Sequence, residues 1–104
     1  RWTAQKHPDL APAFETAIAQ AREQRCALTH GDWSPKNFLI NPGPQLFSID
    51  YEVMHWGDPS FDAAFLLNHF LLKGWHRAGA QPLYAALARE YFSALVRHSG
   101  ADWL

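Results

Sequence analysis

The 104-residue sequence has little cysteine, almost no net charge and no long apolar run. Its one cysteine, Cys26, excludes an internal disulfide and every zinc site that is built from several cysteines. The formal net charge of −1 indicates no basic surface of the kind that binds nucleic acid. No apolar segment reaches the roughly 18 residues that a membrane-spanning helix requires, and no signal peptide is recognisable. We therefore expect no nucleic-acid partner, no membrane partner and a cytoplasmic location.

Glycine-rich phosphate-binding loops are also missing from the sequence. The six glycines are scattered, and neither G-x-G-x-x-G nor G-x-x-x-x-G-K occurs. A lysine in a Val-Ala-Ile-Lys-like strand, which would hold phosphates, is absent as well. The chain begins at Arg1 rather than at a methionine. We therefore interpret residues 1–104 as a single partial domain of a longer protein.

Most of the sequence has a helical pattern. Apolar residues recur at helical spacing over residues 9–24, 60–73 and 81–97. Asp9 is suitably placed to cap the first of these helices at its N-terminus. The helix over 60–73 is apolar on nearly all sides and would need burial on most of them. A chain of 104 residues offers it too few partners, so we expect uncovered apolar surface on this helix.

A short β segment interrupts the helices. The sequence Phe38-Leu39-Ile40-Asn41 and the segment 45–49 are both rich in apolar residues, and Pro42-Gly43-Pro44 separates them. Proline and glycine between two apolar runs favour a turn, so strands are predicted at 38–41 and 45–49. The expected fold class is mainly α with a short β-hairpin (α+β).

Three polar residues surround this predicted hairpin. Asp32 and Asn37 lie in the loop before it, and Asp50 ends the second strand. Because a hairpin folds the chain back on itself, Asp50 can return close to Asn37. Carboxylate and amide oxygens suit Mg²⁺, while Asp32 lies outside the hairpin and is free to accept a proton from a hydroxyl group. This combination is the one that phosphoryl transfer requires.

Each of these residues also has an ordinary structural interpretation. The spacing of Asp32 and Asn37 is common in turns, and Asp50 could simply cap a turn. Asp58 precedes a proline and is a natural helix N-cap. His30 fits a hydrogen-bonded core histidine better than a metal ligand or a base.

Aromatic residues lie close to the polar set in the sequence. Trp33, Tyr51 and Trp56 could form a face for a cationic substrate, although packing in the core explains such residues more often. His69 lies on the apolar helix over 60–73 and is predicted to be a buried side chain with its hydrogen bonds satisfied.

Three sequence motifs follow one another over residues 29–67. They are His30-Gly31-Asp32 with Asn37, Ile49-Asp50-Tyr51-Glu52, and Gly57-Asp58-Pro59-Ser60-Phe61-Asp62. Together they resemble the catalytic core of the aminoglycoside phosphotransferase and choline kinase family, which are relatives of the protein kinases. The resemblance implies that the chain is part of the C-terminal lobe of a protein-kinase-like fold. The N-terminal lobe, which grips ATP in that family, would then be absent from this chain.

The resemblance also implies a role for individual residues within 29–62. Asp32 would be the catalytic carboxylate that deprotonates the acceptor hydroxyl. Asn37 and Asp50 would bind Mg²⁺, and through it the nucleotide. Three further residues would support the site structurally: His30, Asp58 and Asp62. Ser34 stands where many antibiotic kinases have a histidine.

The expected function is transfer of the γ-phosphate of ATP to a hydroxyl group of a small molecule, with Mg²⁺ as cofactor. The fragment alone is expected to be inactive, and its uncovered apolar surfaces favour self-association. A second hypothesis is a non-catalytic remnant, or pseudokinase, that acts as an interaction module. A metal-dependent hydrolase using His30 and Asp32 is a third, for which no further ligand cluster is evident.

Overall fold

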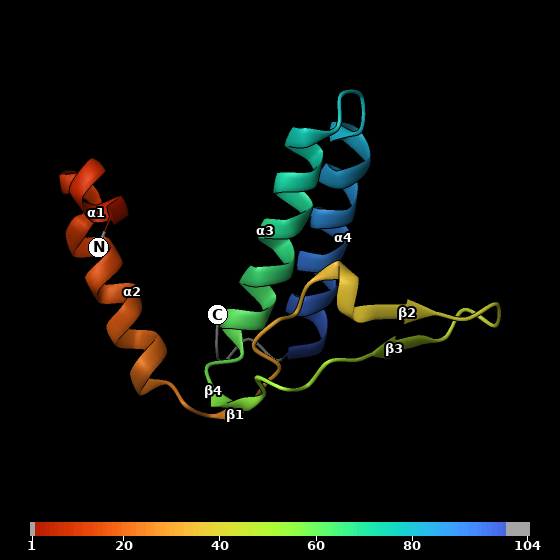
Figure 1. Cartoon of the computed structure of the whole chain (residues 1–104), viewed down its shortest axis with the longest axis horizontal. Helices are drawn as coiled ribbons and strands as arrows, with labels where there is room; N and C mark the ends of the chain where they lie inside the picture. Colours follow the sequence, from red (N-terminus) through yellow and green to blue (C-terminus); the bar gives the residue numbers. More distant parts are fainter. Residues whose placement is uncertain (1, 100–104) are drawn as a thin grey trace.

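The computed structural model describes residues 2–99 and shows a mainly helical chain with two small antiparallel sheets (Figure 1). The predicted mainly α fold with a short β part is therefore confirmed. The helices are α1 (Trp2–Lys6), α2 (Ala11–Glu23), α3 (Ser60–His76) and α4 (Gln81–Ser99), with two 3₁₀ turns, η1 (Pro8–Leu10) and η2 (Pro35–Asn37). The strands are β1 (Ala27–Thr29), β2 (Phe38–Ile40), β3 (Leu46–Ser48) and β4 (His55–Gly57).

The first long helix begins later than its sequence pattern predicts. The backbone N–H of Leu10 donates to the carbonyl of His7 at 3.0 Å, so the chain already turns as a 3₁₀ helix before α2 starts. Asp9 lies inside this turn, and the residue that precedes α2 is Leu10, which makes no side-chain cap. The predicted N-cap role of Asp9 is therefore wrong.

The predicted hairpin is confirmed, with slightly shorter strands. Strand β2 pairs with β3 in antiparallel fashion, and Leu39 lies opposite Phe47. The Asn41 side chain closes the turn, because its Oδ1 accepts hydrogen bonds from the backbone N–H groups of Gly43 and Gln45 at 3.1 and 3.0 Å. The hairpin projects away from the helices on the side opposite α2 (Figure 1).

A second sheet was not predicted, and it frames the polar motif. Strand β1 pairs with β4, with Leu28 opposite Trp56. The first strand leads directly into His30, and the second leads directly into Asp58. The sheet therefore brings the first and third sequence motifs side by side.

Helices α3 and α4 form an antiparallel pair. They approach closely at Gly74, where an added Cβ would lie 3.1 Å from the Cβ of Tyr84. Phe70 and Tyr91 also meet across the pair, with ring centroids 5.9 Å apart. A glycine at position 74 therefore lets the two backbones pack at short range.

The helix over 60–73 is not buried on most sides within the described residues, and the expected uncovered apolar surface is present. Within α3 only Leu66 and Gly74 are buried, whereas Leu71 is 60% exposed. The physical reason is that α4 is the one helix or strand in residues 2–99 with extensive contacts to α3, so much of the rest of its surface stays uncovered. Large apolar side chains are consequently exposed along every long helix.

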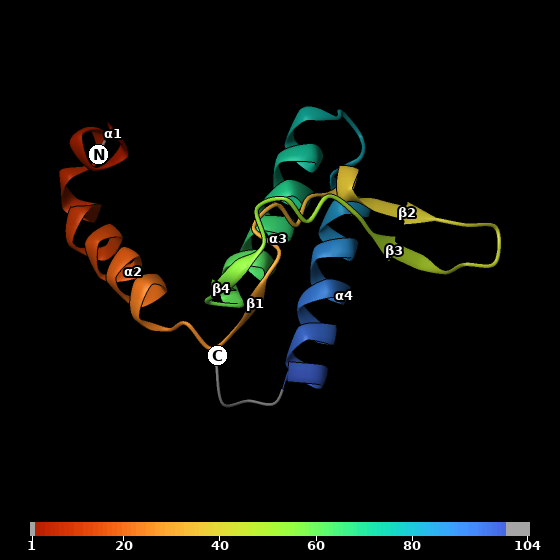
Figure 2. The ribbon, with the colours of Figure 1, turned by 60° about the horizontal axis from the view of Figure 1, so that its bottom comes forward.

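The two N-terminal helices stand apart from the α3–α4 pair (Figures 1 and 2). Helix α2 makes its main contacts with α1 and η1 and contains no buried residue. The radius of gyration is 15.6 Å, compared with about 13 Å for a compact domain of this length. None of the helices in residues 2–99 combines the length and the apolar character that crossing a bilayer demands.

Candidate functional site

The loop after β1 is fixed to the first turn of α3 by one carboxylate. Asp62 accepts hydrogen bonds from two successive backbone N–H groups, that of His30 at 2.6 Å and that of Gly31 at 2.9 Å. Both bonds involve an acceptor that carries charge when ionised, and such bonds are stronger than those between neutral groups. The carboxylate therefore sets the position of the His-Gly-Asp segment relative to the helix.

Gly31 is required by the shape of this loop. Its φ of +84° lies in the left-handed region that side chains disfavour. An added Cβ would also lie 2.9 Å from the carbonyl oxygen of Val53. Only glycine fits here without moving the backbone on either side.

His30 is buried, at 4% exposure, and joins two parts of the site. Its Nδ1 accepts a hydrogen bond from the backbone N–H of Asp32 at 3.3 Å. The other ring nitrogen, Nε2, lies 3.0 Å from the carbonyl oxygen of Ile49. Because Nδ1 is an acceptor, Nε2 carries the hydrogen and donates a hydrogen bond to the carbonyl oxygen of Ile49. The histidine thus connects the Asp32 loop to the residue before Asp50.

Asp32 is oriented by two neighbouring side chains. The amide Nδ2 of Asn37 donates to the Asp32 carboxylate at 3.1 Å and to its backbone carbonyl at 2.8 Å. Lys36 places Nζ 2.9 Å from the same carboxylate oxygen, Oδ2. Lys36 is the main cause of a lowered pKa for Asp32, and Asn37 lowers this pKa further. The Asp32 carboxylate is therefore ionised at neutral pH, with Asn37 and Lys36 both directed at its Oδ2.

Asp50 lies beyond the second strand rather than at its end, because β3 stops at Ser48. Its φ of +67° places it in the left-handed region, which ends the extended conformation. The preceding residue, Ile49, donates its backbone N–H to the carbonyl of Asn37 at 3.0 Å. The chain therefore does return to Asn37 immediately before Asp50. Aspartate is one of the few non-glycine residues that adopt this conformation comparatively often.

Asn37 and Asp50 each carry side-chain oxygens of the kind that hard cations prefer. Asn37 uses its amide nitrogen on Asp32, and its Oδ1 accepts no hydrogen bond from the described residues. The Asp50 carboxylate likewise makes no ion pair or hydrogen bond within residues 2–99. One carboxylate and one carbonyl oxygen are a usual protein contribution to a Mg²⁺ site that nucleotide phosphates complete.

A metal site made by the protein alone has less support. No cluster of three or more His, Cys, Asp or Glu side chains suited to a metal ion occurs in the described part of the chain. The hydrolase hypothesis needs such a cluster around His30, whose two ring nitrogens are already hydrogen-bonded.

Asp58 lies at the start of α3. Its Oδ1 accepts a hydrogen bond from the backbone N–H of Ser60 at 2.9 Å, and its carbonyl accepts one from Phe61 at 3.1 Å. These bonds satisfy donors at the first turn that have no partner within the helix. Asp58 therefore orients the helix that carries Asp62.

The three aromatic residues near the motif do not form one cage. Trp33 and Tyr51 both pack against the ring of His30, with centroid distances of 5.1 and 5.0 Å. Trp56 lies on β4, and its indole N–H donates to the carbonyl of Arg25 at 2.9 Å. Two of the three thus hold the histidine, and the third belongs to the second sheet.

A cavity of about 390 Å³ lies beside Asp32, between the η2 turn and one face of α3. It is lined by Asp32, Ser34, Pro35, Lys36, Phe65, His69 and Lys73. His69 is half-buried and packs edge-on against Phe65 at 5.1 Å, without a hydrogen bond in residues 2–99. The prediction that it is buried and satisfied is therefore wrong. The spacing of Phe65, His69 and Lys73, four residues apart on one helix face, was the signal that sequence reasoning missed.

Comparison with known proteins agrees with this geometry. The profile described as the phosphotransferase enzyme family matches residues 1–103. Searches of curated proteins and of solved structures gave no significant match. The family match covers almost the whole chain and agrees with the resemblance that the three motifs indicated. The chain therefore belongs to the phosphotransferase enzyme family.

Proposed function

We propose that the chain supplies the catalytic residues of a kinase that uses Mg²⁺ and ATP to phosphorylate a hydroxyl group of a small molecule. The observation that supports this most is the fixed Asp32 carboxylate, which Asn37 and Lys36 hold at 3.1 and 2.9 Å in a loop tied to Asp62. An ionised, positioned carboxylate is the group that accepts a hydroxyl proton during phosphoryl transfer. Use of ATP also fits a cytoplasmic location.

The reaction would proceed by in-line displacement. The acceptor oxygen forms a bond to the γ-phosphorus, the bond from that phosphorus to the bridging oxygen breaks, and ADP leaves. Asp32 takes the hydroxyl proton. Asn37 and Asp50 would hold Mg²⁺, which when bound neutralises charge on the phosphates. His30 and Asp62 keep these two loops in register through their backbone contacts.

The sequence contains no glycine-rich loop to cover the nucleotide. Our proposal therefore requires phosphate-gripping groups from a separate lobe, and the chain by itself should be inactive. Self-association through the apolar faces of α3 and α4 is part of the same proposal. Sedimentation that shows only monomer in the isolated chain would contradict this part.

Replacing Asp50 with Asn should weaken Mg²⁺-dependent binding of ATP by at least about tenfold, or about 1.4 kcal/mol. The reason is that the variant loses the one carboxylate in the proposed magnesium site. Calorimetric titration of the full-length protein with ATP, with and without Mg²⁺, measures the effect.

Asp9→Asn is a matched control, because it removes the same charge from a 3₁₀ turn that makes no side-chain cap. Equal Mg²⁺ dependence in the two variants would exclude Asp50 as a ligand. If the unaltered protein binds no Mg²⁺-ATP at all, the interaction-module hypothesis becomes the better one.

Replacing Lys36 with Met should move the acidic limb of the pH–rate profile to higher pH. Lys36 is the main cause of the lowered pKa of Asp32, so its removal raises that pKa and the base becomes protonated at a higher pH. The measurement is kcat/KM as a function of pH.

Lys36→Arg is the matched variant, since it keeps the positive charge and should leave the acidic limb near its original position. An unshifted limb in Lys36→Met would mean that Asp32 is not the titrating base.

A further inference from the structure

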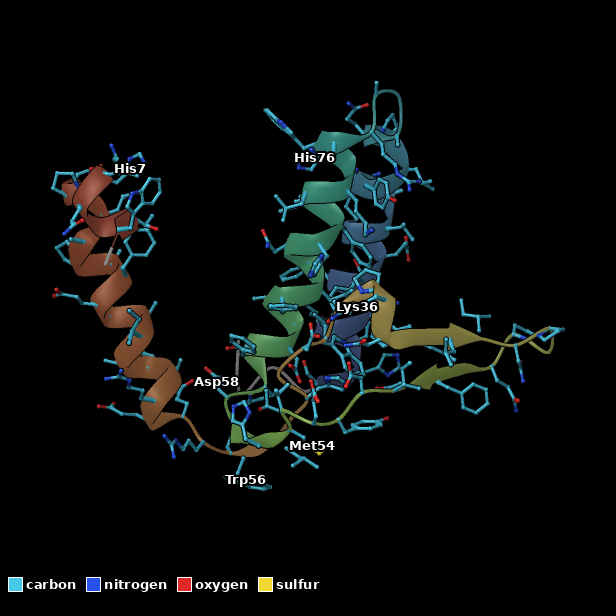
Figure 3. All side chains as sticks on the ribbon, viewed as in Figure 1. His7, Lys36, Met54, Trp56, Asp58 and His76 are labelled. Carbon is cyan, nitrogen blue, oxygen red and sulfur yellow. The ribbon has the colours of Figure 1, made fainter. Side chains whose placement is uncertain are left out.

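The cavity beside Asp32 has the size and the walls of a small-molecule site. Its volume of about 390 Å³ lies within the range of about 300 to 1,000 Å³ that is usual for ligand pockets. Phe65 supplies an apolar wall, and Asp32 opens into the same space. Figure 3 shows Lys36 on the η2 turn, next to the helical pair.

Positive charge is concentrated in this cavity. The sequence contains three lysines, and two of them, Lys36 and Lys73, line it. Asp32 is the one acidic residue among its lining residues. Lys36 already pairs with Asp32 at 2.9 Å and is also attracted by Asp50 and Glu52. The charge of Lys36 is therefore largely balanced within the site.

The charge of Lys73 is not balanced in this way. Lys73 is half-buried and forms no ion pair within residues 2–99. Its place in the last turn of α3 is favourable for a cation, but this does not explain why it faces the cavity of the catalytic loop. His69, one turn earlier, presents ring nitrogens without a hydrogen-bond partner among the described residues. Lys73 and His69 thus bring two groups that can donate hydrogen bonds to an anion into one cavity.

The acceptor is a better occupant of this site than the nucleotide. The cavity includes Asp32, which must face the acceptor hydroxyl, but neither Asn37 nor Asp50, the proposed ligands of the nucleotide-bound metal. A polycationic acceptor would meet Lys73 and be repelled, whereas a carboxylate or a phosphate would be attracted.

We infer that the acceptor is a hydroxyl compound that carries an anionic group, a carboxylate or a phosphate, and that Lys73 and His69 bind this group in the cavity beside Asp32. The inference rests on the proposed kinase function. The anionic group does not react: it holds the acceptor so that its hydroxyl proton passes to Asp32 while the oxygen bonds to the γ-phosphorus and ADP leaves. Lys73 is thus a residue that determines acceptor specificity.

The first test is a titration of the full-length protein with inorganic phosphate. Binding is monitored through the NMR chemical shifts of the backbone amides of residues 65, 69 and 73. Saturable shifts are expected, and the apparent Kd should rise about fivefold or more in Lys73→Met, since a bond to a charged group is lost. Lys6→Met removes the same charge from α1 and should change the Kd less than about twofold. An equal change in the Kd for phosphate in the two variants, or no chemical-shift change at residues 65, 69 and 73, would contradict the proposed anion site.

The second test separates a carboxylate or phosphate acceptor from a neutral or cationic one. Turnover with Mg²⁺-ATP is compared for glycerate against glycerol, ribose 5-phosphate against ribose, and choline as the cationic case. We expect kcat/KM to be at least about tenfold higher for the anionic member of a pair. Lys73→Met should abolish this preference by raising the KM for the anionic acceptor, and Lys73→Arg should keep most of it.

Faster turnover of choline or of the neutral members would overturn the inference. A rise in the KM for ATP, without a rise in that for the acceptor, would assign the cavity to the nucleotide and overturn it as well. If none of these compounds is phosphorylated, the phosphate-binding experiment alone decides whether Lys73 and His69 bind an anion. A different result would contradict the kinase proposal alone. In that case Asp32→Asn would leave turnover unchanged, while phosphate would still bind at Lys73.

Discussion

Replacing Asp32 with Asn should lower kcat for phosphoryl transfer by about 10²- to 10⁴-fold. The amide that replaces the carboxylate has nearly the same shape, but it cannot accept the hydroxyl proton. Asn37 should still donate to the carbonyl oxygen of the new side chain and to the backbone carbonyl, which it contacts at 2.8 Å. The loop should therefore keep its position, and the loss should be confined to the chemical step.

The measurement is steady-state turnover with Mg²⁺-ATP, together with ATP affinity and circular dichroism. ATP affinity should change less than about threefold, because Asp32 is not one of the proposed metal ligands. Asp9→Asn, a charge-matched change outside the site, should retain full activity. Retention of more than about one tenth of the normal kcat in Asp32→Asn would remove the residue from the role of base.

Replacing Asp62 with Ala should reduce the free energy of unfolding by about 3 kcal/mol. The carboxylate accepts two backbone hydrogen bonds, at 2.6 Å from His30 and 2.9 Å from Gly31, and the variant leaves both donors without their partner. Such a loss is a large share of the free energy of unfolding of a typical domain, which is about 5 to 15 kcal/mol. Urea denaturation followed by tryptophan fluorescence measures it.

Two further variants make the Asp62 result specific. Asp62→Asn keeps one acceptor oxygen, so about half of the loss should be recovered. Asp9→Ala should change the unfolding free energy by less than about 0.5 kcal/mol, because no side-chain hydrogen bond is removed. Equal stability of Asp62→Ala and Asp9→Ala would show that the carboxylate does not fix the loop.

Local sequence signals predicted the hairpin and the long helices. Pro42-Gly43-Pro44 favours a turn whatever its surroundings. The spacing of apolar residues over 60–73 and 81–97 matches the period of an α-helix and not that of a strand. The sheet of β1 and β4 was missed, because three-residue strands such as Ala27–Thr29 have no recognisable alternation and form only when their partner is near.

The candidate site was predictable where the residues in contact are close in sequence. Asp32 and Asn37 are five residues apart, and their side chains meet at 3.1 Å. The contact between Asp62 and His30 spans 32 residues. The family pattern indicated a supporting role for both residues, but only the fold shows that they meet. The four-residue spacing of Phe65, His69 and Lys73 places them on one helix face, but only the packing of α3 beside the η2 turn shows that this face borders Asp32.

The separation of α2 from the rest of the molecule has a consequence for how the chain opens. Helix α2 contains no buried residue and makes its main contacts with α1 and η1, so its unfolding costs little tertiary packing. The loop that carries Asp32, in contrast, is fixed to α3 by the two hydrogen bonds that Asp62 accepts. Local opening of α2 therefore leaves Asp32 in place, and hydrogen exchange should resolve two cooperative units within one short chain.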